Sequence, residues 1–369
     1  MASDGTRAIR SLGVERPGEW FFASYEEGPP PEGQFRVETL YSGLSAGTEL
    51  TFAKGTNPYL HARWDEGLGV FVQNEPGAAY PVPFLGYMEV GRVAESRTPA
   101  VAEGAVVGMT YGHKSGHTAD PRHELAVPIP PEVDPVLGIY AAQMGPICAN
   151  GLLHAAADLA GADVRSLGDG VRGRCVLVVG AGVVGLLTAL FARRHGAAEV
   201  LVSDPSPYRR GVAERLGFAT ADEPDAWRLC KERWSHGGSD RGADVAFQCR
   251  AHSASLHEAL RALRPQGAVI DLAFYQGGSP DLRLGEEFHH NGLAVRCAQI
   301  GRVPRGLSFA WDRRRLALET LDLLRAEGTA IREHMVTQVV PVDDAPAFLA
   351  DLGAHRRDFC QVVFRFGPA

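Results

Sequence analysis

Hydrophobic and polar positions divide the chain into regions of different period. Up to about residue 145, short apolar or alternating runs are separated by Gly and Pro, which predicts a β-rich region. The strands expected there are Phe35–Tyr41, Gly91–Glu95, Ala105–Met109 and Glu124–Pro128. Thr56–Pro83 is rich in Gly, Pro and aromatic residues and has weak periodicity, so we expect a long functional loop.

The middle of the chain alternates strand-like apolar runs with helical patterns, which predicts a doubly wound α/β fold with a parallel sheet. The expected strands are Cys175–Val179, Glu199–Ser203, Ala243–Gln248 and Gly267–Ala273, and the expected helices are Val136–Leu159 and Ser253–Leu263. The last part predicts a helix over Arg313–Glu327, a strand over Met335–Pro341, a capped helix from Asp343 and a final strand over Gln361–Phe366.

A glycine motif carries the strongest functional signal. Gly180-x-Gly182-x-x-Gly185, which encloses Val183 and Val184, follows the strand Cys175–Val179 directly. A helical pattern of Leu186, Leu187, Leu190 and Phe191 begins immediately after it. This context predicts a dinucleotide site in which the helix N-terminus binds the pyrophosphate. The alternative is a doubly wound domain that binds no nucleotide.

Asp204 ends the second strand about 20 residues after the glycines, where an acidic residue can bind the ribose hydroxyls of NAD. Arg209 and Arg210 follow closely and could instead accept the 2′-phosphate of NADP. The sequence therefore favours NAD and leaves NADP open.

Composition restricts the class of protein. A chain of 369 residues with 45% hydrophobic and 22% charged residues is expected to form two domains of an ordinary globular enzyme. A net charge of −7 argues against a nucleic-acid or anionic-membrane partner, and no apolar run is long enough to span a bilayer. We expect a cytoplasmic protein, because the first residues have no apolar signal core, and six scattered cysteines that stay reduced.

The whole chain resembles the medium-chain dehydrogenase/reductase superfamily. The motifs that carry the resemblance are Ser42-Gly-Leu-Ser-Ala-Gly-Thr-Glu49, Pro83-Phe-Leu-Gly-Tyr-Met-Glu-Val-Gly-Arg-Val93, Glu103-Gly-Ala-Val-Val107, Val127-Pro-Ile-Pro130, the glycine motif and Leu263-Arg-Pro-Gln-Gly-Ala-Val-Ile270. The first of them is similar to a bacterial branch that includes the bacteriochlorophyllide a dehydrogenases. The resemblance implies a GroES-like catalytic domain over 1–147 and 300–369, a Rossmann domain over 148–299, and an active site in the cleft between them.

The zinc-dependent members of that superfamily ligate zinc at three positions that this sequence fills differently. The positions fall on Ala46 (or Ser45), on Tyr87 with Met88 beside it, and near Pro146, two residues before Cys148. The segment between Glu95 and Glu124, where relatives carry four cysteines for a structural zinc, has none. Because zinc requires thiolate, imidazole or carboxylate ligands, we expect this chain to bind neither the catalytic zinc nor the structural zinc.

Without zinc, hydrogen-bond donors and a general acid/base must act on the reacting oxygen. The candidates are Tyr87, Thr48, Glu49, Tyr111 and His113. Tyr87 could instead be a packing residue, Thr48 a capping residue, and Glu49 or His113 a surface residue. We expect His113, His117 and His123 to be surface histidines that bind no metal, with a proton-transfer role open for His113.

The resemblance also implies backbone contacts to the nicotinamide near Ala273, Phe274 and Gly301, and a homodimer formed through residues 294–300. The expected function is zinc-independent NAD(P)-dependent hydride transfer between a secondary alcohol and a ketone of a polar small-molecule metabolite. The alternatives are a zinc-free NADPH-dependent enoyl or quinone reductase, a non-catalytic dinucleotide-binding sensor and, as a minor option, a redox-neutral enzyme such as an epimerase.

Overall fold

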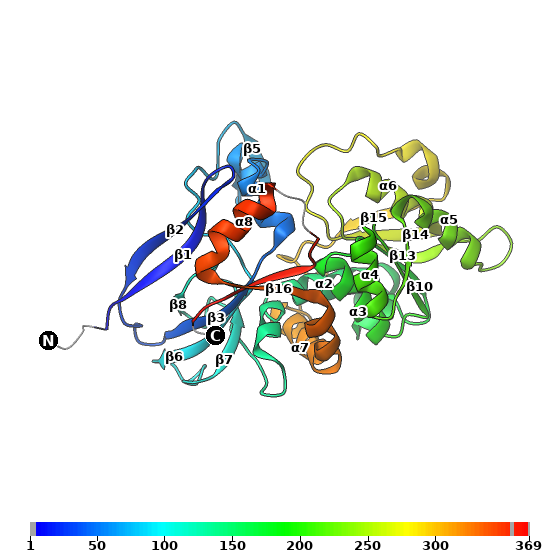
Figure 1. Cartoon of the computed structure of the whole chain (residues 1–369). Coiled ribbons are helices and arrows are strands. Elements are labelled where there is room, and N and C mark those ends of the chain that lie inside the picture. The colour runs from blue at the N-terminus through cyan, green and yellow to red at the C-terminus, as the bar shows by residue number, and fades with distance from the viewer. Residues whose placement is uncertain (1–4, 355–357, 368–369) are drawn as a thin grey trace. The chain divides into compact units, whose positions relative to one another are not determined.

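The computed structural model describes residues 5–354 and 358–367, which form two compact units (Figure 1). The first unit contains the chain up to residue 142 and from residue 336 onward, and the second contains residues 143–335. The return to the first unit was expected at residue 300 and occurs at Val336. Helix α7 (Arg313–Ala330) stays with the second unit because it packs closely on α2 (Met144–Ala160): a Cβ on Gly145 would lie 2.1 Å from Cγ2 of Thr320.

The first unit is built on a mixed sheet in the order β16-β17-β3-β6-β7-β9, with β8 also paired to β3. These strands are β3 (Phe35–Gly43), β6 (Glu89–Ser96), β7 (Val106–Met109), β8 (Gly116–Ala119), β9 (Val127–Pro128), β16 (Val336–Pro341) and β17 (Gln361–Arg365). The hairpin β1 (Arg7–Arg16) and β2 (Glu19–Glu27), the short helix α1 (Ala46–Ala53) and helix α8 (Ala345–Ala354) complete the unit. The sequence patterns missed β1, β2 and α1.

Three expected elements in this part of the chain are corrected. Thr56–Pro83 is not irregular throughout, because it contains the 3₁₀ turn η1 (Pro58–Leu60) and the hairpin β4 (Ala62–Asp65) and β5 (Val70–Gln73). The helix expected over Val136–Leu159 is split into the 3₁₀ helix η2 (Pro135–Tyr140) and α2, and the strand expected over Glu124–Pro128 is only two residues long.

The second unit is a six-stranded parallel sheet in the order β12-β11-β10-β13-β14-β15. Its strands are β10 (Cys175–Val179), β11 (Glu199–Ser203), β12 (Ala219–Ala221), β13 (Ala243–Gln248), β14 (Leu263–Asp271) and β15 (Ala294–Cys297). Helices α3 (Val183–Arg194), α4 (Pro207–Arg215), α5 (Glu223–Arg233) and α6 (Ser253–Ala262) connect strands of this sheet. In order of sequence this is 3-2-1-4-5-6, the doubly wound arrangement, so the sequence-based fold class is confirmed.

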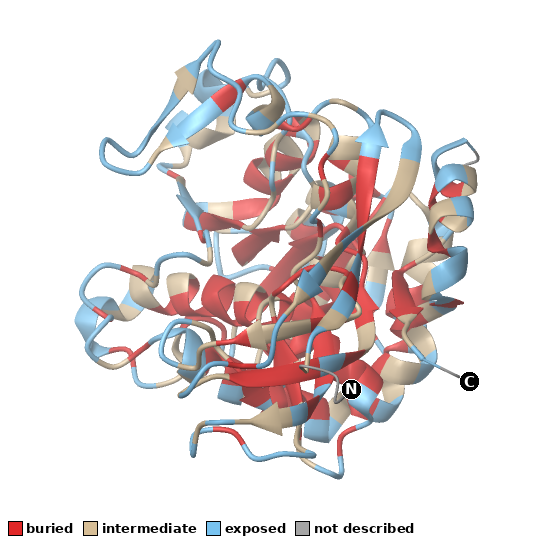
Figure 2. Ribbon diagram, turned by 90° about the vertical axis from the view of Figure 1, so that its left-hand side faces the viewer, coloured by how far each residue is buried: buried red, intermediate tan, exposed pale blue. Residues whose placement is uncertain are grey.

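Three predicted strands of this sheet, β10, β11 and β13, have the predicted bounds. The strand β10 is buried from Val176 to Val179, as a central parallel strand should be. Buried residues are concentrated along the strands and on the helix faces that cover them (Figure 2).

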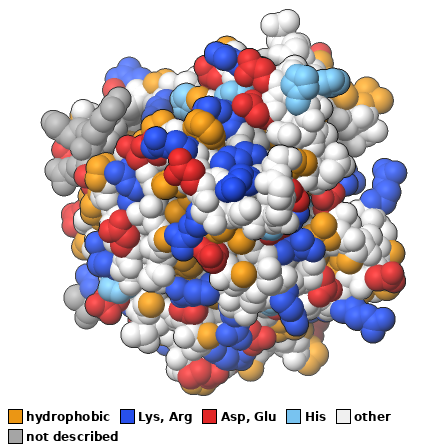
Figure 3. Space-filling view, turned by 90° about the vertical axis from the view of Figure 1, so that its right-hand side faces the viewer, with side chains coloured by type: hydrophobic (Ala, Val, Ile, Leu, Met, Phe, Trp, Pro, Cys, Tyr) orange, Lys and Arg blue, Asp and Glu red, His pale blue; other side chains and the backbone are white. Residues whose placement is uncertain are grey.

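On the face of the second unit that Figure 3 shows, basic and acidic side chains are interspersed. None of the helices in the described ranges is both long and apolar enough to cross a membrane.

Candidate functional site

The glycine turn after β10 has the geometry that the motif requires. Gly180 has a φ of +103°, which favours glycine, and a Cβ on Gly185 would lie 1.7 Å from the carbonyl oxygen of Gly180. A Cβ on Gly182, in contrast, would have only Nη1 of Arg209 nearby, at 3.8 Å. The backbone at Gly182 and the half-buried Val183 and Val184 is therefore accessible at the N-terminus of α3, where a phosphate group would bind.

Asp204, directly after β11, is tied to this turn. Its Oδ2 accepts a hydrogen bond from the backbone N–H of Ala181 at 2.9 Å, and its Oδ1 accepts one from Ser206 at 2.8 Å. The residue is only 2% exposed. Each carboxylate oxygen keeps a further lone pair for a ribose hydroxyl, and the fixed negative charge would repel a 2′-phosphate.

The two arginines beyond Asp204 differ in their surroundings. Arg210 donates to the backbone carbonyl of Asp204 at 2.6 Å and lies 3.4 Å from the Asp222 carboxylate. Arg209 is half-buried and its guanidinium group lies on the side of Gly182. Of the two, Arg209 is the one placed near the expected phosphate position.

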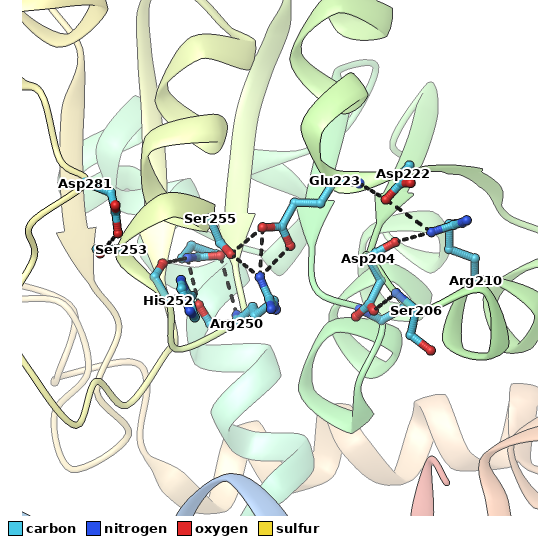
Figure 4. Close-up of polar contacts among 12 residues, drawn as sticks. Asp204, Ser206, Arg210, Asp222, Glu223, Arg250, His252, Ser253, Ser255 and Asp281 are labelled. Carbon is cyan, nitrogen blue, oxygen red and sulfur yellow. Dashed lines mark hydrogen bonds and ion pairs between the residues drawn. The ribbon is translucent and has the colours of Figure 1, made fainter. Parts of the chain in front are cut away.

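A second polar cluster lies at the carboxyl end of β13, and the sequence analysis missed it (Figure 4). Nη1 of Arg250 donates to both carboxylate oxygens of Glu223, at 2.9 and 3.0 Å, and to Oγ of Ser255 at 2.8 Å. A Cβ on Gly180 would lie 3.2 Å from Cβ of Arg250, so this arginine borders the glycine turn. Strands β10 and β13 are the pair at which the strand order reverses, which is where doubly wound sheets bind ligands.

The end of β14 carries a buried acid. Asp271 accepts hydrogen bonds from the backbone N–H of Ala273 at 2.9 Å and from the Tyr275 hydroxyl at 3.0 Å. Burial raises the pKa of the Asp271 carboxyl group, and these two donors only partly offset that effect. Ala273 is half-buried, whereas Phe274 and Gly301 are exposed.

The candidates for proton transfer lie in the first unit, and three residues form a buried charged group there. Nε2 of His113 lies 2.6 Å from Oε2 of Glu49, and Nδ1 lies 2.7 Å from Oγ of Ser42. Burial opposes protonation of His113, but the carboxylates of Glu49 and Glu89 together outweigh it, so the pKa of the imidazole is raised. The expectation that His113 is a surface residue is therefore wrong.

The other two histidines differ from His113. His117 is half-buried and lies 2.7 Å from Oε2 of Glu124, and His123 is exposed. The surface expectation is thus confirmed only for His123.

Glu89 is a second buried acid close to His113. Its oxygens accept backbone N–H groups of Met88 at 3.0 Å and Tyr111 at 2.7 Å. Burial nevertheless raises the pKa of the Glu89 carboxyl group to about 7.

Ser45 links the buried group to Tyr87 and was missed as a site residue. Its backbone N–H donates to Oε1 of Glu49 at 2.7 Å, while its Oγ is in a short hydrogen bond with the Tyr87 hydroxyl. Tyr87 and Thr48 are half-buried, and Thr48 lies in the first turn of α1, next to Glu49. The geometry thus joins Tyr87, Glu49 and His113 through one serine, whereas no hydrogen bond of the Thr48 hydroxyl is observed in the described residues.

The other positions of the zinc-ligand pattern hold groups that do not ligate zinc readily. Ala46 and Met88 have no suitable ligand atom. The Cys148 thiol donates to the Val184 carbonyl at 3.4 Å, and burial raises its pKa to about 12, so it is a neutral thiol in this structure.

The chain is similar to known dehydrogenases. The family model described as zinc-binding dehydrogenase matches residues 183–307. D-guloside 3-dehydrogenase of Escherichia coli (strain K12) is 25% identical over 344 residues, which cover 92% of this chain and 94% of that protein. L-threonine 3-dehydrogenase of Pyrococcus horikoshii is 34% identical over 107 residues, or 29% of this chain and 30% of that protein.

Solved structures share the fold over nearly the whole chain. The structure of 2R,3R-butanediol dehydrogenase from Bacillus subtilis has a TM-score of 0.71 at 16% identity and covers 98% of this chain and 100% of its own. A short chain alcohol dehydrogenase from Escherichia coli CFT073, complexed with NADH, has a TM-score of 0.68 at 14% identity, with 97% and 99% covered.

Proposed function

We propose that this chain is an NAD(P)-dependent oxidoreductase of the medium-chain dehydrogenase/reductase superfamily that acts on alcohols without zinc. The family match and the similarity to dehydrogenases support the first part of this proposal. The proposed substrate is a secondary hydroxyl group, or the corresponding ketone, of a sugar or polyol. D-guloside 3-dehydrogenase, which matches the chain nearly end to end, is named for a sugar derivative, and this supports the proposed substrate class. The proposal that zinc takes no part rests on the residues at the zinc-ligand positions, because their side chains do not ligate zinc readily.

The cofactor would be held by the second unit. Gly182, Val183 and Val184 would bind the pyrophosphate through backbone N–H groups, with Gly180 and Gly185 shaping the turn. Asp204 would accept hydrogen bonds from the ribose hydroxyls of NAD. Backbone groups of Ala273, Phe274 and Gly301 would contact the nicotinamide. Bound nicotinamide would supply or accept the hydride.

Tyr87 would transfer the proton to or from the reacting oxygen. During reduction its hydroxyl would give its proton to the ketone oxygen as the hydride reaches the carbon, and the resulting tyrosinate would be reprotonated from solvent. During oxidation the tyrosinate would take the alcohol proton as the hydride leaves. Ser45 would hold the Tyr87 hydroxyl in position, and Glu49 and His113 would hold Ser45 in turn. Thr48, which lies beside Glu49 on α1, would provide a second hydroxyl group.

Cofactor choice and assembly are also part of the proposal. We favour NAD over NADP because the Asp204 carboxylate is fixed beside the turn, although Arg209 could accept a 2′-phosphate. We further propose a homodimer that pairs the exposed edge strand β15 with that of a second copy.

The test is turnover by metal-depleted protein. The full chain would be dialysed against a chelator, its metal content measured, and its NAD and NADP reduction assayed with a panel of sugars and polyols. We expect turnover to survive chelation and to favour NAD. Activity that disappears with the metal and returns only with zinc would overturn the zinc-independent mechanism. Failure to bind any nicotinamide nucleotide would overturn the proposed cofactor site.

A further inference from the structure

Three side chains away from the glycine turn are close enough to share one ion. His257 lies on α6, and Glu286 and Glu287 lie on the short π-helical segment η5 (Leu284–Phe288). One ring nitrogen of His257 and one carboxylate oxygen of each glutamate all lie within 4.8 Å of one another.

Two polar atoms of this trio are buried without a hydrogen bond. Nδ1 of His257 and Oε2 of Glu287 are both shielded from solvent, and neither has a partner among the described residues. A buried polar atom with no partner costs stability, so each such atom in a native protein requires an explanation. A cation between these side chains would satisfy both atoms once the ligand atoms, which lie within 4.8 Å of one another, close to the spacing that bonds of about 2.0–2.2 Å require.

The neighbouring arginines leave these atoms available. Nε of Arg261 lies 3.7 Å from Oε1 of Glu287, and Nη1 of Arg283 lies 3.5 Å from Oε1 of Glu286. In both pairs the recorded contact is to Oε1, and Oε2 of Glu287 has no hydrogen bond among the described residues. Two carboxylates would also neutralise a divalent charge.

From this geometry we propose that His257, Glu286 and Glu287 bind a divalent transition-metal ion of the zinc type. An imidazole nitrogen with carboxylate oxygens suits zinc, whereas magnesium and calcium prefer oxygen ligands alone. The ion would join α6 to the segment that follows β14, which Ser253 also joins to α6 by a 2.6 Å hydrogen bond to Asp281. Its role would be structural, and it does not depend on the proposed reaction.

The test is zinc binding by the full chain after chelation, followed by calorimetric titration with zinc alone. We expect one zinc per chain, with binding at least about tenfold weaker in the variants His257→Asn and Glu287→Gln. The matched control is His290→Ala, because His290 is exposed and lies beside His289 with the two rings 5.5 Å apart, a pair that could bind zinc adventitiously. The control should bind as the unmodified chain does.

Two further measurements keep the test decisive. Circular dichroism and thermal melting without metal check that each variant folds, and Glu287→Gln serves if His257→Asn does not. Cobalt in place of zinc should give visible absorption bands without a thiolate charge-transfer band, which separates this site from one at Cys148. The proposal would be overturned if the unmodified chain bound no zinc, or if His257→Asn and Glu287→Gln bound zinc as tightly as the unmodified chain does. A thiolate band, or loss of binding in His290→Ala, would also overturn it. Loss of zinc from the variants with turnover retained would leave the zinc-independent reaction intact.

Discussion

The Tyr87 hydroxyl group is the single group on which the proposed chemistry depends most. Replacing Tyr87 with Phe removes it and keeps the ring, so we expect kcat to fall about 100-fold or more, as for loss of a general acid/base. Nucleotide affinity should not change, because the nucleotide site is built from other residues. Steady-state kinetics and a cofactor titration would measure the two effects.

The control for that variant is Tyr59→Phe, which removes a hydroxyl group from an exposed ring in edge-to-face contact with Phe71, with ring centroids 5.4 Å apart. Its kinetics should match those of the unmodified protein. A Tyr87→Phe variant with normal kcat would assign the proton transfer to another group.

Glu89 predicts a dependence of stability on pH. Its pKa is raised from the usual 4.5 to about 7 in the folded state, so between these values the folded chain binds a proton that the unfolded chain has lost. The stabilisation is complete below pH 4.5 and is lost as pH rises through 7. The shift corresponds to roughly 3 kcal/mol at most.

Chemical denaturation at pH 5 to 8 of the unmodified chain and of Glu89→Gln would isolate this contribution. The difference in unfolding free energy between the two proteins should fall as pH rises. The comparison is needed because His195, whose pKa burial lowers to about 4, acts in the opposite direction over part of this range. A difference that stays constant with pH would show that Glu89 is ionised throughout.

At the scale of elements, two glycines of the turn between β10 and α3 allow the effects of a substitution on stability and on nucleotide binding to be measured separately. In Gly185→Ala, the new Cβ would overlap the Gly180 carbonyl, so we expect a loss of about 2 kcal/mol or more in stability together with loss of nucleotide binding. In Gly182→Ala, the new Cβ has room in the protein but would stand where the phosphate should approach. That variant should melt near the unmodified temperature and yet bind NADH at least about tenfold more weakly. Equal nucleotide affinity of Gly182→Ala and the unmodified chain would contradict the proposed pyrophosphate position.

The elements that the sequence predicted best are those whose local pattern leaves little choice. β10, β11 and β13 are apolar runs between clear breaks, and their bounds agree with the structure. The hairpin β4–β5 was hidden because each strand has only four residues, too few to show a period. A single helix was predicted over Val136–Leu159 because the apolar spacing continues through this region. The break between η2 and α2 depends on the backbone geometry of residues 141–143, which the apolar spacing does not show.

The candidate site was predicted where one motif contains all its residues. The glycine turn and Asp204 fall on a single short stretch of sequence. Arg250 and Ser255 lie five residues apart, but Glu223 lies 27 positions before Arg250, and only the fold of the sheet brings it to them. The burial of His113 likewise depends on Glu49 and Ser42, both more than 60 positions earlier in the chain.

At the scale of the whole molecule, the proposed homodimer rests on the free edge of the second unit's sheet. β15 pairs with β14 on one side only, and Val295 in it is 39% exposed, an apolar side chain on an open edge. Val295→Asp should place charge in the paired interface, so we expect sedimentation to show the mass of one chain instead of two. Ala219→Asp, on the exposed end of the opposite edge strand β12, is the matched control and should leave the mass unchanged. If both variants were monomeric, or if both remained dimeric, the contact between copies would lie elsewhere. Only a dimer that pairs through β15 should be broken by Val295→Asp and kept by Ala219→Asp.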